Sequence, residues 1–90
     1  MSEQYVIELK YGTYGLPDVE YTPGAKLSIK KQDNTYTIYG NELGLLFLAH
    51  NLIALAKMEM KPGNEGYHIH LDDLYALNVE NIDLILRRET

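Results

Sequence analysis

The run HIHLDD, which begins at His68, is the group of side chains best suited to metal chemistry in this sequence. In a strand, His68 and His70 project from one face, and Asp72 follows in phase if the strand continues. Imidazole and carboxylate groups in such a row could hold a divalent ion. The same alternation would also place polar groups on the solvent side of a sheet while Ile69 and Leu71 enter the core. Catalytic zinc sites usually take ligands from several elements, so we favour the solvent-side interpretation. A metal site at His68, His70 and Asp72 is kept as the alternative.

Other arrangements that could support catalysis are weak. The two serines, Ser2 and Ser28, have no Gly-x-Ser-x-Gly turn around them, and the chain contains no cysteine. Asp72 and Asp73 are adjacent carboxylates, but neighbours in sequence usually point apart, and turn capping is their commoner role. No phosphate-binding glycine motif precedes the predicted helix. We therefore predict a protein that is not an enzyme and needs no cofactor.

The length and charge of the chain limit the number of domains and the kinds of partner that it can have. Ninety residues are enough for one domain, residues 1–90, with one hydrophobic core. The formal net charge of -5 repels phosphate backbones, so nucleic acid is not an expected partner. The N-terminus lacks the pattern of a signal peptide, and the longest apolar segment is too short to cross a bilayer. A cytoplasmic protein without membrane contact is expected, and its acidity suits docking onto a basic protein.

Hydrophobic periodicity predicts an α+β fold, a single antiparallel sheet with one long helix packed on one face. Apolar and polar residues alternate in several segments, as in half-buried strands, and apolar residues recur with helical spacing in one segment. The stretch from residue 11 to 25 contains three glycines and two prolines, which predict a long loop or irregular hairpin. The predicted order is β-β-β-α-β-β, with strands near residues 5–9, 27–31, 35–39, 67–71 and 82–87, and a helix over 41–58 capped by Asn41.

The predicted helix is apolar around most of its circumference, so two faces have to be distinguished. One wide face is predicted to pack on the sheet and to place Leu48 and Leu52 in the core with Ile69; it comprises Leu45, Leu48, Ala49, Leu52, Leu55 and Ala56. The opposite arc is more apolar than a solvated face usually is. A homodimer or a structural homo-oligomer is therefore possible, and the candidate interface residues are Leu43, Phe47, His50 and Met58.

Tyrosine is unusually frequent, with eight residues, whereas tryptophan is absent. Tyrosine offers rigid amphipathic area and is enriched at protein interfaces. Three tyrosines occur in the long loop beside two carboxylates, and further carboxylates follow the histidine pair. These residues predict a partner-binding surface that comprises Tyr11, Tyr14, Asp18, Glu20, Tyr21, His68, His70, Asp72, Asp73 and Asp83. For any single tyrosine, covering the edge of a small core is the commoner role.

Three stretches in the second half of the chain have a distinctive order and spacing: IYGNELGLLFLAHNLIALAK, GYHIHLDD and IDLILRR. In these stretches, which span residues 38–88, the chain resembles the immunity protein 32 family of bacterial polymorphic toxin systems. The Gly-Asn pair before the helix and the His-x-His-Leu-Asp strand end are the most specific parts. The resemblance implies a small cytoplasmic antitoxin that neutralises a cognate secreted or contact-delivered toxin by binding it. It brings no catalytic residues and does not name the toxin.

Overall fold

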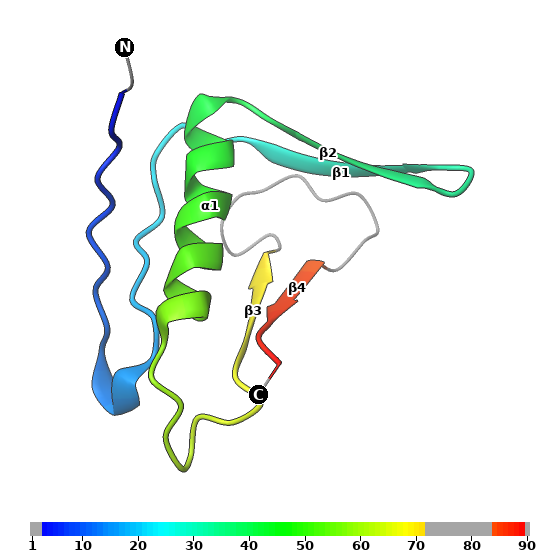
Figure 1. Cartoon of the computed structure of the whole chain (residues 1–90). Helices are drawn as coiled ribbons and strands as arrows, with labels where there is room; N and C mark the ends of the chain where they lie inside the picture. Colours follow the sequence, from blue (N-terminus) through cyan, green and yellow to red (C-terminus); the bar gives the residue numbers. More distant parts are fainter. Residues whose placement is uncertain (1–2, 72–83, 90) are drawn as a thin grey trace.

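The computed structural model of the chain describes residues 3–71 and 84–89, and it has the predicted α+β class (Figure 1). The described strands form two separate antiparallel hairpins rather than one sheet. The prediction of a single continuous sheet is therefore wrong, whereas the antiparallel pairing within each hairpin is confirmed. The regular elements are the 3-10 helix η1 (Thr13–Gly15), β1 (Leu27–Gln32), β2 (Thr35–Gly40), α1 (Glu42–Lys57), β3 (His68–Leu71) and β4 (Leu84–Arg87).

The first predicted strand, residues 5–9, runs extended beside α1 but forms no ladder with another described segment (Figure 1). The chain turns back through η1, and the two arms meet only near the turn. There Tyr11 and Pro17 form an isolated antiparallel bridge, and the Asp18 N–H donates to the Lys10 carbonyl at 2.9 Å. Because proline has no N–H to donate, Pro17 interrupts a ladder where it would begin.

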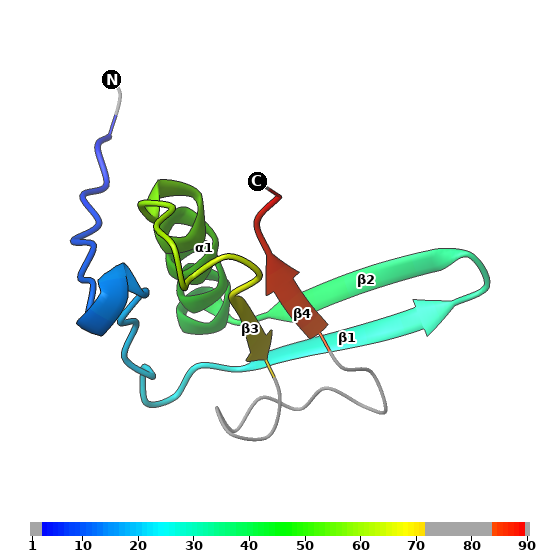
Figure 2. The same cartoon turned by 90° about the horizontal axis from the view of Figure 1, so that it is seen from below.

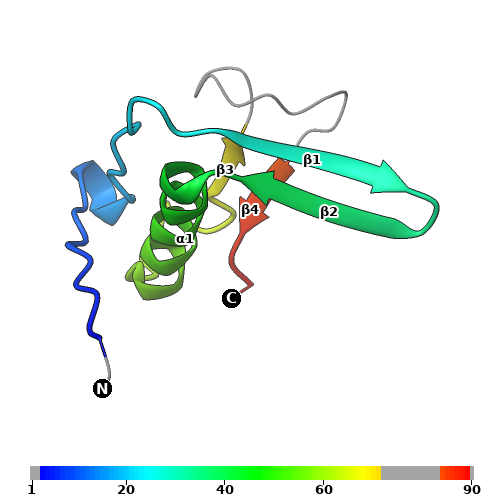
Figure 3. The ribbon, with the colours of Figure 1, turned by 90° about the horizontal axis from the view of Figure 1, so that it is seen from above.

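Strands β1 and β2 pair in register from Leu27–Gly40 to Gln32–Thr35. The two-residue turn between them contains Asp33 with a φ of 55°, a left-handed conformation that aspartate tolerates better than most residues. The hairpin projects sideways from the N-terminal end of α1, away from the chain's first residues (Figure 3). Only its base is packed, since Leu27 and Ile29 are buried while residues 30–36 are exposed.

Helix α1 confirms the predicted range and N-cap. The Asn41 side-chain oxygen accepts from the Gly44 N–H at 2.8 Å and from the Lys26 N–H at 2.9 Å. Its amide group donates to the Gly24 carbonyl at 2.9 Å. Asn41 thus caps the helix and also ties its first turn to the chain that leads into β1.

The rotation of α1 differs from the prediction. The buried helix residues are Gly44, Phe47, Asn51, Ala54 and Leu55, whereas the predicted core residue Leu52 is 47% exposed. The cause is a close approach of the chain before β1, because a methyl group on Gly44 would overlap the Lys26 carbonyl oxygen. Only glycine allows this contact, and it turns the stripe that contains Phe47 inward. The predictions for Ile69, which is buried, and Leu48, which is partly buried against the core, agree with the structure.

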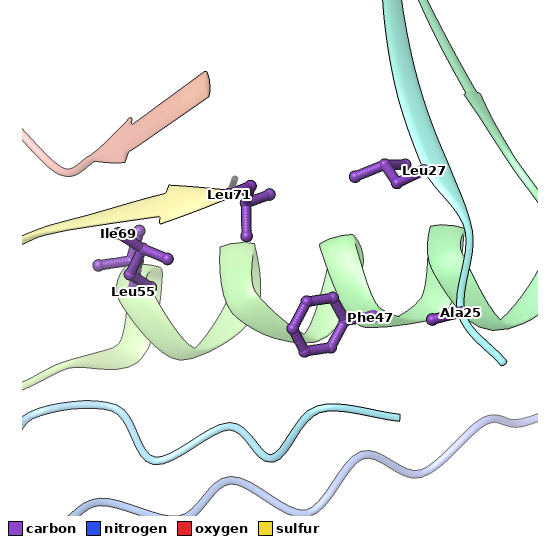
Figure 4. Close-up of a cluster of buried hydrophobic side chains, with 6 residues drawn as sticks. All are labelled: Ala25, Leu27, Phe47, Leu55, Ile69 and Leu71. Carbon is purple, nitrogen blue, oxygen red and sulfur yellow. The ribbon is translucent and has the colours of Figure 1, made fainter. Parts of the chain in front are cut away.

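The core lies between α1, β3 and the chain entering β1 (Figure 4). In this view Ile69 of β3 lies beside Leu55 of α1, while Phe47 points from the helix away from β3. The core cluster comprises Ala25, Leu27, Phe47, Leu55, Ile69 and Leu71, with Val19, Leu48, Tyr67 and Leu86 packed against it. Within the described part of the chain, no helix has the length and apolar composition needed to cross a membrane.

Candidate functional site

Residues 3–22 form two extended arms that cover one side of α1, and we call them the N-terminal layer. The helix lies between this layer and the β3–β4 hairpin (Figure 2). The predicted long loop is confirmed as an irregular hairpin, because η1 reverses the chain and the arms share the Tyr11–Pro17 bridge.

Side chains on the inner face of the N-terminal layer hold it to the helix. The Tyr11 hydroxyl donates to the Ala54 carbonyl at 2.9 Å, near the helix C-terminus, where carbonyls lack partners within the helix. The Tyr21 ring meets Phe47 edge-on, with centroids 6.2 Å apart. His50 Nε2 lies 3.0 Å from the Glu8 carbonyl, and the ring nitrogen is the donor because a carbonyl can only accept. Tyr11, Tyr21 and His50 therefore have roles in packing the fold.

The outer face of the N-terminal layer is acidic. Because successive side chains of an extended segment point to opposite faces, residues next to Tyr11 and Tyr21 in sequence face away from these contacts, and Lys10 and Glu20 are exposed. Three exposed residues on this face carry carboxylates, namely Glu8, Asp18 and Glu20. We call these three residues the acidic face. Asp18 and Glu20 are among the binding residues predicted from the sequence, whereas Glu8 is not.

A groove of about 480 Å³ is lined by residues of both arms of the N-terminal layer and of α1. All three carboxylates of the acidic face line it, against one ammonium group, that of Lys10. Its apolar lining includes Val6, which is 93% exposed, and Leu46, which is 50% exposed. The groove therefore combines negative charge with apolar surface, a combination that suits the long aliphatic stem and charged end of lysine or arginine. Val6, Glu8 and Lys10 alternate along the sequence with Ile7 and Leu9, and this alternation could have indicated that these three side chains line one surface.

Tyr14 occupies a different position from the other predicted tyrosines. It is 80% exposed in η1 and has a φ of 63°, which is unusual for a bulky residue. The turn thus displays its ring to solvent beside the closed end of the N-terminal layer. Among the loop tyrosines predicted to bind a partner, Tyr14 has the accessibility that the role requires.

The two histidines of β3 lie together on one face, as the alternation predicts, with ring centroids 4.7 Å apart. The Arg87 guanidinium of β4 lies 3.2 Å from His68 Nδ1, and the Gly66 carbonyl lies 3.1 Å from the same atom. That nitrogen can accept from Arg87 or donate to Gly66, but not both. The positive charge of Arg87 disfavours a metal ion at this nitrogen. Among the residues that the structure describes, no three His, Asp or Glu side chains are grouped to hold a metal ion. Asp72, Asp73 and Asp83 lie outside the described residues.

The predicted oligomer interface on α1 needs correction. Phe47 and Met58 are buried, at 2% and 3% exposure, because the helix is turned by the contact at Gly44. Leu43 is 41% exposed, and His50 contacts the N-terminal layer. An interface that requires both Phe47 and Met58 on the surface is therefore incompatible with this structure.

The fold and its surface together define a small α+β protein with an acidic, partly apolar groove beside a helix. The family model of immunity protein 32 matches residues 35–89, which include β2, α1, β3 and β4. The match covers more than half of the chain, so the protein belongs to the immunity protein 32 family. Comparisons with curated proteins and with solved structures give no match.

Proposed function

We propose that this protein is an immunity protein that binds a cognate bacterial toxin and neutralises it without catalysis. The family match over residues 35–89 carries the proposal. In such a role the protein acts in the cytoplasm of the toxin-producing cell and protects that cell or its kin.

The surface described above supports binding as the mechanism. The acidic face can steer the protein toward a basic toxin surface, since complementary charge raises association rates. Tight binding also needs desolvated side chains, and tyrosine is among the types that most often contribute interface energy. Tyr14 and the exposed Val6 are accessible for this purpose. The predicted contacts of Tyr14, Asp18 and Glu20 with a partner are part of this proposal.

The experiment uses a toxin domain sought in the reading frames next to that of this protein. We expect bacteria that express the toxin domain to survive only when this protein is co-expressed, and the purified proteins to form a stoichiometric complex. If inhibition works by binding, toxin activity disappears at a one-to-one ratio. It returns when the toxin is separated in denaturant and refolded.

Two outcomes would contradict the proposal. Inactivation at far below one equivalent, with a toxin that stays inactive after separation and refolding, would indicate enzymatic modification. Absence of both protection and complex formation would contradict immunity against that toxin. A matched control is the Asp33→Asn variant, because Asp33 lies at the tip of the β1–β2 hairpin, and asparagine also tolerates its left-handed backbone.

A metal-binding function is the second candidate, motivated by the 4.7 Å separation of the His68 and His70 rings. The guanidinium of Arg87 argues against it, since a cation at His68 would face a fixed positive charge. We expect calorimetric titration with zinc to show no stoichiometric binding at micromolar concentrations. One-to-one binding that His70→Ala abolishes would instead support the metal-binding function.

A further inference from the structure

The N-terminal arm has the sequence of a strand but lacks a strand partner among the described residues. Tyr5, Val6 and Ile7 are of types that favour strands, and Tyr5 and Val6 are 80% and 93% exposed. An extended backbone without a ladder presents rows of unpaired N–H and C=O groups that another chain can pair with. The arm is held in place by its contacts to α1 and to the returning arm, so its shape is already formed.

The contacts of the arm identify which edge is open. In an extended segment, backbone groups of alternate residues point to opposite edges. The carbonyls of Glu8 and Lys10 are both engaged, with His50 and with the Asp18 N–H. Residues of the other parity, Tyr5, Ile7 and Leu9, therefore direct their backbone groups to the opposite edge. Within residues 3–71 and 84–89, no hydrogen bond reaches the backbone of these three residues.

We propose that the toxin adds an extended segment to the open edge formed by Tyr5, Ile7 and Leu9, and that this segment carries lysine or arginine residues that meet the acidic face. Main-chain hydrogen bonds would supply affinity, as in other cases of strand addition, and alternate side chains would supply specificity. Basic side chains on the exposed side of the added strand would be cross-strand neighbours of Glu8. From there they could extend along the apolar lining of the groove toward Glu20. This inference rests on the proposed function.

Charge favours a basic toxin segment over a second copy of this chain. Each copy has a formal net charge of -5, so two copies repel each other. Antiparallel pairing of two arms about Ile7 would also bring two acidic faces to the same side of the joint sheet. A segment with lysine or arginine side chains carries positive charge, which is opposite to the charge of the acidic face. Its charge is therefore complementary to that of this protein.

The first test uses the complex of this protein with the toxin domain that the experiment under Proposed function identifies. Hydrogen exchange should show that the amides of Tyr5, Ile7 and Leu9 exchange fast in the free protein and become strongly protected in the complex. If the complex forms and these amides stay unprotected, strand addition is wrong while the proposed function stands. If the wild-type protein forms no complex with the toxin domain, the proposed function itself fails.

The second test removes single backbone donors on the two edges. Tyr5→Pro deletes an N–H on the open edge and should weaken the complex about ten-fold, because one hydrogen bond is lost and the proline ring blocks the approach. Gln4→Pro deletes an N–H on the inner edge, at an exposed residue outside the groove, and should change the dissociation constant about two-fold or less. Tyr5→Ala separates the loss of the ring from the loss of the N–H. Both sites are exposed, so circular dichroism and thermal unfolding should show unchanged folds. Equal effects of the two prolines would overturn the assignment of the edge.

The third test concerns charge. The triple variant Glu8→Gln, Asp18→Asn, Glu20→Gln should lower the association rate about ten-fold at low salt and should lose most of its salt dependence. The control Asp33→Asn changes charge on the distant hairpin tip and should leave the rate within about two-fold of the wild type. A triple variant that binds with the wild-type rate and salt dependence would rule out a basic segment. Sedimentation that shows a stable dimer of the free protein, broken by Tyr5→Pro, would identify a second copy as the occupant instead.

Discussion

Helix α1 is covered on two sides in different ways. On one side the β3–β4 hairpin pairs over four residues in each strand and packs Ile69 and Leu71 into the core. On the other side the N-terminal layer has almost no ladder and is held by isolated contacts, such as the Tyr11 hydroxyl on the Ala54 carbonyl. A segment can therefore be fixed in place by side chains while its backbone edge stays open. That open edge is what the proposed strand addition uses.

The helix end is also held from both sides. Tyr11 reaches it from the N-terminal layer, and the Arg88 guanidinium donates to the Met58 carbonyl from the chain after β4. A cation at this position also interacts favourably with the negative end of the helix dipole. The N-terminal layer and the chain after β4 therefore both contact the C-terminal end of α1.

The largest expected effect is that of truncating Phe47, which packs against Tyr21 on one side and belongs to the core cluster on the other. Phe47→Ala should lower the free energy of unfolding by about 3–5 kcal/mol, as loss of a buried aromatic ring typically does. Leu52→Ala on the same helix should cost less than about 1.5 kcal/mol, because Leu52 is 47% exposed. Chemical denaturation measures both values. Equal losses would show that a further element covers the leucine-rich face.

A smaller loss is expected from a methyl group at Gly44, where the helix meets the Lys26 carbonyl. Gly44→Ala should cost about 1–3 kcal/mol, despite the better helix propensity of alanine, because backbone atoms must separate. The matched control is Gly12→Ala, since nothing lies within 4 Å of an added methyl group there. A stable Gly44→Ala variant would mean that α1 can rotate, and the assignment of its buried face would then be wrong.

Asn41 should show an intermediate effect. Asn41→Ala removes the cap on Gly44 and the links to Gly24 and Lys26, so a cost of about 1–2 kcal/mol is expected in thermal or chemical unfolding. Asn41→Asp keeps an acceptor for the cap but loses the donor to Gly24, and it should recover part of the loss. If the aspartate variant is as unstable as the alanine variant, the cap on Gly44 is not the source of the stability.

The smallest expected effect comes from a substitution that tests the N-terminal layer against the β3–β4 hairpin. Tyr11→Phe removes the hydroxyl that bonds the Ala54 carbonyl and should cost about 0.5–1.5 kcal/mol. Hydrogen exchange should quicken in the N-terminal layer and remain slow in β3, because the layer has little ladder of its own. Tyr14→Phe is the control, since Tyr14 is 80% exposed. Uniform acceleration across both covers would show that they open together.

The sequence by itself predicted the elements whose cause is local. Asn41 before a run of apolar residues predicts where α1 begins, and the turn residues Asp33 and Asn34 between two strand-forming segments predict the β1–β2 hairpin. The histidine alternation likewise predicts that His68 and His70 share a face of β3. The composition also indicated an acidic surface, and Asp18 and Glu20 do lie on it.

The tertiary structure alone decided how these elements meet. Periodicity could not choose between two apolar faces of α1, because the choice depends on the Lys26 carbonyl, which lies far from Gly44 in sequence. Alternation at Tyr5–Leu9 predicted a strand, but pairing needs a partner with free N–H groups, and Pro17 interrupts the nearest one. The division into two hairpins and the open edge of the N-terminal arm follow from such long-range contacts, which local patterns do not contain.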